Sequence, residues 1–414
     1  MFKQLIAVIS MSLQTVPQRL GAVFKQLIAV ISMSLQTVPQ RLGASSVIVI
    51  GIAGVVAVLV SVLAMGAGFQ HTLADSGRDD RVIILRGGSD AELNSNLTRT
   101  DIATISNAPG LAKDAAGKAL LSSELVTVVN VPKLDTGTDA NVTLRGVGLK
   151  LTEVRPEVKI VSGTMFRPAV RELIAGVGAA KLFRGLTVGS VLHLRNVDWT
   201  VTGIFSSNGD VRESELLADV DTVGSSIERT GYSSAVGLLT SAAAFTAFKD
   251  SLTSDPTLTV DVQREREYYA KQSAGLTKTI NIVGTTVAVI MAIGAMFGAL
   301  NTMYSAVAAR GLEIATLRAI GFGAFPVLFG VIIESLLLSL LGGAIGASLA
   351  WLFFNGHTVS TLGAAFAQVV FSLRVTPTLI ITGIVWACII GLLGGFFPAL
   401  RAARLPVAEA LRAG

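Results

Sequence analysis

The residues best suited to chemistry, histidine and cysteine, are few and isolated in this chain. His71, His193 and His357 belong to no HExxH pattern and have no second ligand at metal spacing. The single cysteine, Cys388, lies in an apolar stretch and has no second cysteine with which to form an internal disulfide. The sequence therefore predicts no metal site and no catalytic residue, and we expect each histidine to be an ordinary surface or packed side chain.

Glycine pairs occur at residues 146/148, 176/178 and 321/323, where a nucleotide-binding loop could begin. None of them continues to the third glycine of a dinucleotide fingerprint, and the pattern GxxxxGK[ST] occurs nowhere in the 414 residues. The backbone amides of such loops are what cradle phosphates. We therefore expect this chain to bind no cofactor, to hydrolyse no ATP and not to be an enzyme.

Long apolar runs dominate the sequence and set its class. Each is long enough to cross a bilayer core of about 30 Å, and Glu334 is the only charged residue in them. They predict four transmembrane helices, at residues 45–69, 280–309, 326–354 and 375–400. With 51% hydrophobic and only 15% charged residues, a single soluble core would be implausibly apolar.

Residues 70–275 have a different composition and are predicted to form an extracytoplasmic domain. Strand-like and helix-like patterns alternate there, with strands expected around Val82–Leu85 and Trp199–Phe205 and a helix expected from Thr100. The fold class that follows is an α-helical membrane protein with four transmembrane helices plus an α+β two-lobed extracytoplasmic domain. The charged run at 264–271 is predicted to be a helical stalk that leads into the second transmembrane helix.

The positions of the Lys and Arg residues predict the orientation of the chain in the membrane. Outside residues 70–275 there are 11 Lys and Arg but only three Asp and Glu. By the positive-inside rule, both termini and a segment at 310–325 face the cytoplasm, and the large domain and a short loop at 355–374 face the periplasm. The basic residues that fall on the inner side are Lys3, Arg19, Lys25, Arg41, Arg310, Arg318, Arg401, Arg404 and Arg412. The basic excess therefore belongs to the membrane part, including the tail at 401–414, and nucleic acid is not an expected partner.

The chain begins with an exact tandem repeat. FKQLIAVISMSLQTVPQRLGA stands at residues 2–22 and again at 24–44, where apolar residues follow helical spacing. Residues 1–44 are thus expected to be a duplicated amphipathic segment on the inner membrane surface. Because the second copy alone adjoins the first transmembrane helix, deletion of the first is expected to leave the protein working.

Two features within the apolar runs are candidates for helix packing and for an intramembrane polar role. Small residues four apart let helix backbones approach closely, either within one subunit or across a dimer. Such pairs stand at Gly294 and Gly298, Gly342 and Gly346, and Gly391 and Gly395. Glu334 is costly inside a membrane and is expected to find a partner such as Ser305 or Ser335, with a coupling role as the alternative.

The segment RGLEIATLRAIGF at 310–322 lies between the second and third apolar runs. Arg310 and Glu313 are one helical turn apart and are expected to pair. An apolar side suited to a groove on a partner protein is formed by Leu312, Ile314, Leu317 and Ile320.

Several stretches together closely resemble the permeases of MacB/FtsX/LolC-type ABC transporters. They are the pattern RxxEIxxLRAxG at 310–321, ESLLLSLLGGAIGA in the third apolar run, and FPALRAARLPVAEALRAG at the C-terminus. VSGTMF, ELIAGVGAAKLF, TVGSVL and WTVTGIF between residues 161 and 205 look like the MacB-type periplasmic core domain. The resemblance covers roughly residues 24–414.

The resemblance implies a permease subunit that couples a separate ABC ATPase, which would bind ATP and Mg, to movements of the periplasmic domain. It assigns ATPase coupling to Arg310, Glu313, Ile314, Leu317, Arg318, Ala319 and Gly321. The expected setting is a bacterial inner membrane, in a homodimer or a heterodimer with a related permease, among membrane lipids. Export with a periplasmic adaptor and an outer-membrane channel is the expected role. Lipoprotein release like that of LolC/E permeases, or FtsX-like signalling without transport, are the alternatives.

The sequence also departs from better-known members of this family. It carries no fused ATPase domain, Gly311 stands where a polar or basic residue is common, and 323–325 replaces a basic stretch. The extracytoplasmic domain is much longer than that of cell-division FtsX. The substrate is not written in these residues.

Overall fold

The computed structural model describes residues 42–363 and 367–406, which divide into two compact units. Of these residues, the helical unit contains 42–64, 281–355 and 375–406, and the core domain contains 65–280, 356–363 and 367–374. The expected amphipathic segment, as far as residue 41, and the expected tail from residue 407 lie outside the described residues.

Four helices in the described part of the chain are long and apolar enough to cross a membrane, as the sequence predicts. They are α2 (Leu42–Asp75), α8 (Glu265–Ala309), α10 (Ala324–Phe354) and α11 (Pro377–Ala403). The helix α8 begins well before its apolar residues, because the charged run that precedes them is also helical. A short helix, α9 (Gly311–Ala319), separates α8 from α10.

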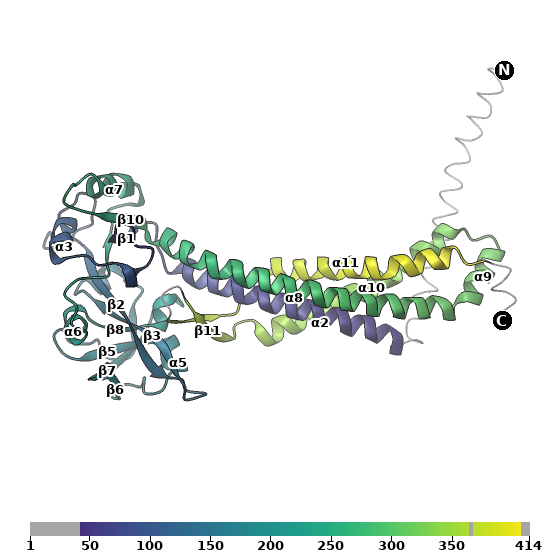
Figure 1. Ribbon diagram of the computed structural model, residues 1–414, viewed down its shortest axis with the longest axis horizontal. Helices are drawn as coiled ribbons and strands as arrows, with labels where there is room; N and C mark the ends of the chain where they lie inside the picture. The colour runs from purple at the N-terminus through teal and green to yellow at the C-terminus, as the bar shows by residue number, and fades with distance from the viewer. Residues whose placement is uncertain (1–41, 364–366, 407–414) are drawn as a thin grey trace, which may run out of the picture. The chain divides into compact units, whose positions relative to one another are not determined.

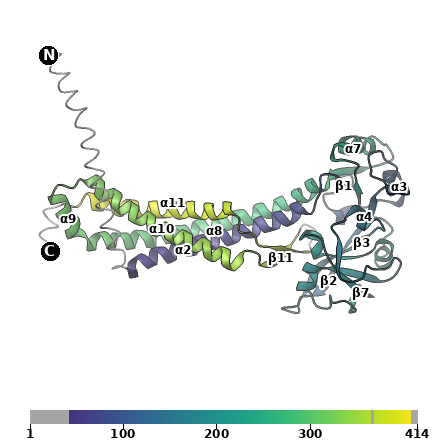
Figure 2. The ribbon, with the colours of Figure 1, turned by 180° about the vertical axis from the view of Figure 1, so that it is seen from behind.

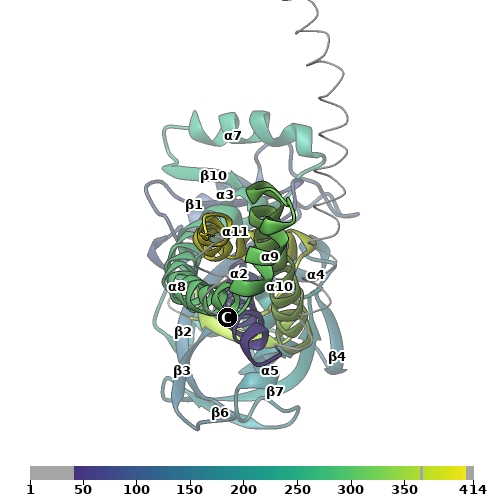
Figure 3. The same cartoon turned by 90° about the vertical axis from the view of Figure 1, so that its right-hand side faces the viewer.

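Small residues bring the helices of the helical unit together. A Cβ atom added at Gly346 of α10 would lie 2.4 Å from the carbonyl oxygen of Ala53 in α2, and one at Gly383 of α11 would lie 2.9 Å from Val56. The view along the bundle shows α2, α8, α10 and α11 gathered side by side (Figure 3). In lipid the hydrophobic effect does not drive helices to associate, and the van der Waals contacts of closely approaching backbones do so instead.

The core domain is built on one mixed sheet. Within residues 42–363 and 367–406 its strands run in the order β10-β1-β9-β2-β3-β8-β5-β7-β4, with β6 paired to β7. The β3–β8 and β5–β7 pairs are parallel and the other pairs are antiparallel. The strands are β1 (Arg81–Arg86), β2 (Leu121–Pro132), β3 (Asp139–Val147), β4 (Lys159–Gly163), β5 (Glu172–Gly176), β6 (Val191–Leu194), β7 (Val197–Ser206), β8 (Leu216–Asp219), β9 (Ser234–Leu238) and β10 (Val260–Arg264).

Short helices cover both ends of this sheet. Figure 1 shows α3 and α7 near β1 and β10, and α6 near β8 and β5. The α-helices are α3 (Arg99–Ser106), α4 (Leu151–Val154), α5 (Val177–Leu182), α6 (Val220–Ser226) and α7 (Phe245–Thr253). The 3₁₀ helices are η2 (Glu92–Asn94), η3 (Val211–Ser214) and η4 (Ala242–Ala244). The helix expected from Thr100 is α3, and its N-cap is Thr98, which forms a capping box with Asp101.

Two separate apolar clusters explain the two-lobed pattern of the sequence. One contains Val82, Phe248 and Val262 at the β1–β10 end, and the other contains Leu144 and Trp199 at the β3–β7 end. The lobes are therefore two halves of one sheet, each with its own core.

The loop between α10 and α11 forms a β-hairpin, β11 (Thr358–Leu362) and β12 (Gln368–Ser372). It packs within the core domain, where the ring of Phe371 meets Phe69 edge-on with centroids 5.5 Å apart. The hairpin is thus part of the core domain although both of its neighbouring helices belong to the helical unit.

Candidate functional site

The helix α9 is a separate element because the chain breaks its helical path at both ends. Arg310 is its N-cap, with φ of −101°, and Ile320 is its C-cap. Gly321 follows with φ of +104°, and the amides of Gly321 and Phe322 donate to the carbonyls of Arg318 and Leu317 at 3.2 and 3.0 Å. These bonds form a Schellman motif, which needs a glycine-like conformation at residue 321. Figure 2 shows α9 at the end of the bundle where α11 also ends.

A buried ion pair fixes the start of α9. The guanidinium of Arg310 donates from Nη1 to Oε2 of Glu334 at 2.8 Å, and both side chains are buried. The expected pair with Glu313 is only a 4.0 Å contact of Nε, because Arg310 sits at the helix break and its side chain turns toward α10. The junction between α8 and α9 is therefore tied to α10 by an ion pair.

The expected serine partners of Glu334 are wrong. Ser335 donates to the carbonyl of Gly391 at 2.7 Å, and Ser305 donates to the carbonyl of Asn301 at 3.1 Å. The physical reason is that a buried carboxylate is compensated by a cation far better than by a hydroxyl group.

The faces of α9 divide into an inner and an outer set. Ile314 is buried in the core of the helical unit, whereas Leu312 and Ile320 are 51% and 69% exposed. Glu313 and Ala319 are also exposed, so the outer face consists of Leu312, Glu313, Thr316, Ala319 and Ile320. We call this set the α9 outer face. It combines apolar side chains with one carboxylate, which suits contact with a protein surface.

Arg318 and Leu317 are half-buried and have structural roles. Nη1 of Arg318 donates to the carbonyls of Ala403 and Leu405 at 3.0 and 2.9 Å, at the C-terminal end of α11. A cation there satisfies free carbonyls and opposes the negative end of the helix dipole. Of the seven predicted coupling residues, then, Glu313 and Ala319 face outward, Arg310, Ile314, Arg318 and Gly321 shape the helix, and Leu317 is half-buried between the two faces.

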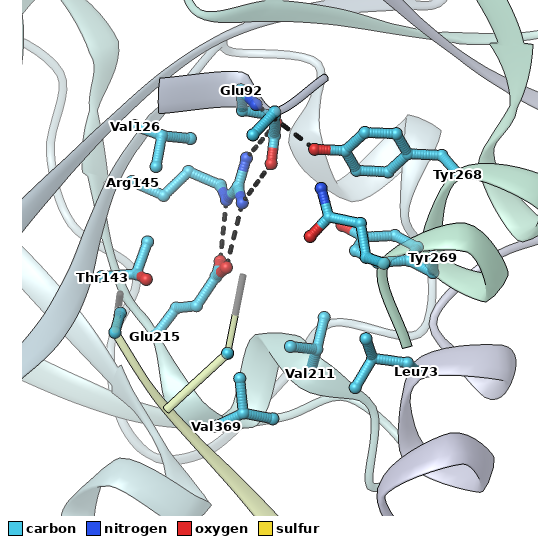
Figure 4. Close-up of a pocket in the computed structure, with 14 residues that line it drawn as sticks. Leu73, Glu92, Val126, Thr143, Arg145, Val211, Glu215, Tyr268, Tyr269 and Val369 are labelled. Carbon is cyan, nitrogen blue, oxygen red and sulfur yellow. Dashed lines mark hydrogen bonds and ion pairs between the residues drawn. The ribbon is translucent and has the colours of Figure 1, made fainter. Parts of the chain in front are cut away.

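The core domain contains a second polar site that the sequence analysis missed. Eight buried side chains form what we call the ionic cluster, in which Arg145 donates to Glu124 and is also bound on both edges of its guanidinium by Glu92 and Glu215, with two hydrogen bonds each (Figure 4). These four contacts are 2.7 to 2.9 Å long. The members are Arg81, Arg145, Arg155, Arg212, Glu92, Glu124, Glu215 and Glu265.

Charge pairing keeps these groups ionised. Burial alone would raise the pKa of Glu92, but the guanidinium of Arg145 outweighs that effect and lowers the pKa to about 2. Burial opposes ionisation of Glu215 as well, and Arg145 with Arg212 nevertheless lowers its pKa. A cavity of about 50 Å³ adjoins the cluster and is lined by Tyr268 and Tyr269 of α8, space for about one or two water molecules.

Comparison with known proteins decides the family. The model for the MacB-like periplasmic core domain matches residues 44–255, just over half of the chain, and the model for the FtsX-like permease C-terminal region matches residues 285–407. The chain belongs to the MacB/FtsX-type ABC transporter permeases.

Individual relatives agree with this membership. The macrolide export ATP-binding/permease protein MacB of Psychrobacter cryohalolentis is 25% identical over 88% of this chain and 56% of its own length. The same-named protein of Shewanella oneidensis is 34% identical over 33% of this chain and 20% of its own length. The chain thus spans about half the length, or less, of these relatives.

Two solved structures are also similar. The extracellular domain of the noncanonic ABC-type transporter YknZ from Gram-positive bacteria is 17% identical, covers 44% of this chain and 100% of its own, and has a TM-score of 0.34. The periplasmic region of MacB from Actinobacillus actinomycetemcomitans is 13% identical, covers 47% and 92%, and has a TM-score of 0.36.

The histidine and acidic side chains of this MacB-type permease are of the kinds that bind metal ions in proteins. In the described ranges, no group of three or more His, Cys, Asp and Glu side chains could hold a metal ion. His71 and His193 are exposed and lie 2.9 and 2.8 Å from Asp75 and Asp198, as ordinary surface pairs do.

The predicted glycine pairs of the permease do not all behave alike. Gly342 lies against the backbone of Val49 in α2, and a Cβ at Gly391 or Gly395 would meet Ser339 or Ser335 of α10. Neither Gly294 nor Gly298 of α8 has an atom within 4 Å of the position of a Cβ. Two pairs thus pack within the chain, and the third is open there.

Gly346→Ala is expected to destabilise the helical unit by about 1 to 3 kcal/mol, since its methyl group would meet the backbone of Ala53. Thermal unfolding in detergent checks this. Gly294→Ala is the matched control and should leave stability equal or better, because alanine favours helices and the site is open. A loss at Gly294 as large as that at Gly346 would show that Gly294 packs against another molecule.

Proposed function

We propose that this chain is the permease subunit of an ABC transporter and that an ABC ATPase docks on the α9 outer face. The observation that carries the proposal is the exposure of Leu312, Glu313 and Ile320 on a helix whose opposite side is anchored. The anchors are the Arg310–Glu334 ion pair and the hydrogen bonds of Arg318 to the end of α11. A pull or push on this face would therefore act on α8, α10 and α11 together.

Two observations support a separate ATPase as the source of energy. The phosphate-binding pattern GxxxxGK[ST] does not occur in the 414 residues, and we propose that ATP is bound by another sequence. The relatives named above are ATP-binding/permease proteins, which pair the two activities. We propose a separate ATPase subunit, carrying ATP and Mg, in a bacterial inner membrane with both termini of this chain on the ATPase side.

The path of the chain supports transmission of movement. The helix α8 is continuous for 45 residues, from Glu265 in the ionic cluster to Ala309, the residue before Arg310. A continuous helix can convey displacement along its axis. We propose that ATP-driven movement at α9 reaches the core domain through α8, and that this work drives export from the cell envelope, as the macrolide export names of the relatives suggest.

Affinity purification of the full chain from its native membrane tests the proposal. Wild-type protein should recover an ABC ATPase, and Leu312→Asp should recover at least about tenfold less, because a charge would replace a central apolar contact. Leu149→Asp is the matched control, since Leu149 is 77% exposed but lies in the core domain. Equal recovery by Leu312→Asp and wild type would contradict docking on this face.

The other recovered proteins distinguish the possible roles. A periplasmic adaptor and an outer-membrane channel would support export. Lipoproteins in their place would favour release of lipoproteins, and a cell-wall hydrolase would favour signalling without transport. A second copy of this chain or a related permease would give the composition of the dimer.

A further inference from the structure

A single short turn contacts all three segments by which the core domain continues into membrane helices. This turn is η3, whose sequence with its flanks is Asp210 to Glu215, and its residues are buried except for Glu213, which is partly exposed. Asp210 caps it by accepting a hydrogen bond from the amide of Arg212 at 2.9 Å. The turn is therefore a fixed and enclosed element rather than a surface loop.

Three hydrogen bonds join η3 to three different segments of the chain. The amide of Val211 donates to Oγ of Ser76, the residue directly after α2, at 2.8 Å. Nη2 of Arg212 donates to the hydroxyl of Tyr269 in the second turn of α8, also at 2.8 Å. These two bonds tie the turn to the outer ends of the first and second membrane helices.

The third bond reaches the hairpin that connects the other two membrane helices. Oγ of Ser214 accepts from the amide of Val370 in β12 at 2.8 Å, and β12 belongs to the hairpin between α10 and α11. All of these partners lie in the core domain. Three of the four residues of η3 thus hold the outer connections of all four membrane helices.

Two glycines allow the backbone of the same turn to approach closely. A Cβ atom at Gly176 would lie 2.2 Å from the carbonyl oxygen of Glu213, and one at Gly178 would lie 2.9 Å from it. The amide of Gly176 also donates to the carbonyl of Glu215 at 3.0 Å. The glycine pair 176/178 therefore makes room for the backbone of η3.

We propose that η3 is a mechanical hub, through which α2, α8 and the β11–β12 hairpin move the sheet of the core domain as one body. This inference rests on the proposed function, in which movement passes from the ATPase to the core domain. If the three contacts were independent, loosening one would leave the others unchanged. If they form one unit, loosening one weakens all three.

Amide hydrogen exchange on the full chain in lipid nanodiscs tests the hub without any ATPase. Ser214→Ala should speed exchange of the Val370 amide about fivefold, the effect of losing one hydrogen bond. The deciding variant is Ser76→Ala, which does not touch Val370 and should nevertheless speed its exchange severalfold. Ser273→Ala is the matched control, because that buried hydroxyl bonds only the carbonyl of Ala270 in its own helix.

The double variant Ser76→Ala/Ser214→Ala completes the cycle. Its effect on exchange of the Val370 amide should differ from the product of the two single effects. A purely local effect of Ser76→Ala together with a multiplicative double variant would overturn the hub. Because this result does not depend on recovery of an ATPase, failure of the hub and failure of ATPase docking are distinguishable.

Discussion

Arg145→Met is expected to unfold the core domain or to destabilise it by at least about 3 to 5 kcal/mol. Arg145 is 3% exposed and is the shared partner of Glu92, Glu124 and Glu215. Its removal takes away the ion-pair partner of Glu92 and leaves Glu124 and Glu215 with weaker pairs, to Arg212 at 3.3 Å and, for Glu124, to Arg155 at 3.5 Å. The loss is a large part of the stability of a typical domain, about 5 to 15 kcal/mol. Urea unfolding of the full chain in nanodiscs, followed by amide exchange in β2 and β3, measures it.

The matched control is Arg99→Met. Arg99 pairs with Asp221 at 3.1 Å, but both side chains are well exposed, so its removal should change stability by less than about 1 kcal/mol. Equal losses of stability in Arg145→Met and Arg99→Met would show that burial of the ionic cluster does not increase its contribution to the free energy of unfolding.

The pH dependence should change sign between wild type and Arg145→Met. In wild type the folded state lowers the pKa of Glu92 from 4.5 to about 2, so its contribution is present above pH 4.5 and is lost as pH falls toward 2. Without Arg145, burial would raise this pKa instead, and the variant should regain stability as pH falls below neutrality. A variant that grows weaker with acid, as wild type does, would contradict the assignment of Arg145 as the main compensating charge.

Glu334→Leu is expected to be the most damaging change in the helical unit. It leaves the buried guanidinium of Arg310 without its 2.8 Å partner, and breaking a buried pair from one side costs about 3 to 5 kcal/mol. Thermal unfolding in detergent and the yield of membrane-inserted protein measure the loss.

The double variant Arg310→Met/Glu334→Leu separates charge from packing. Because replacement of both partners by apolar residues is often neutral, it should recover most of the stability lost in Glu334→Leu. A double variant as unstable as the single one would mean that Glu334 acts by packing and not through Arg310. The recovered variant would also show whether Arg310 contributes to ATPase binding.

The membrane part of the fold could be predicted because lipid imposes a simple rule. Long apolar runs that cross lipid form helices, because a helix satisfies its own backbone hydrogen bonds. The four helices lie where these runs are. In the core domain, alternation in Trp199–Phe205 predicts β7, since its inward residues are apolar. Pairing between distant strands, such as β3 with β8, has no local signal and could not be predicted.

The ionic cluster could not be predicted because buried and exposed charges look alike in a sequence. Glu124 and Arg145 stand among apolar strand residues, and alternation alone would place such charges on a solvated face. They are buried with partners that arrive from η2 and η3: Glu92 pairs with Arg145, and Arg212 pairs with Glu124. A charged residue inside an otherwise apolar strand is the signal that could have pointed to them.

The position of the segment at 310–322 could be predicted from the sequence, but the orientation of its side chains could not. Its pattern identifies residues 310–322, yet the helix break at Arg310 redirects that side chain from Glu313 to Glu334. The prediction placed Leu312 and Ile314 on one apolar side, whereas the structure exposes Leu312 and buries Ile314, because residues two apart lie on opposite faces of a helix. Such a division depends on which side of α9 the bundle covers, which one sequence does not record.

Site-specific photo-crosslinking from α9 tests the central claim most directly. A photoreactive amino acid placed at Leu312, on the α9 outer face, should form an adduct with an ABC ATPase in native membranes, and the adduct should disappear when Ile320→Asp is added. The same probe at Ile314, on the buried face, should form none. An ATPase adduct at neither position, with both proteins folded and inserted, would contradict docking on α9, and an adduct only at Ile314 would contradict the assignment of its outer face.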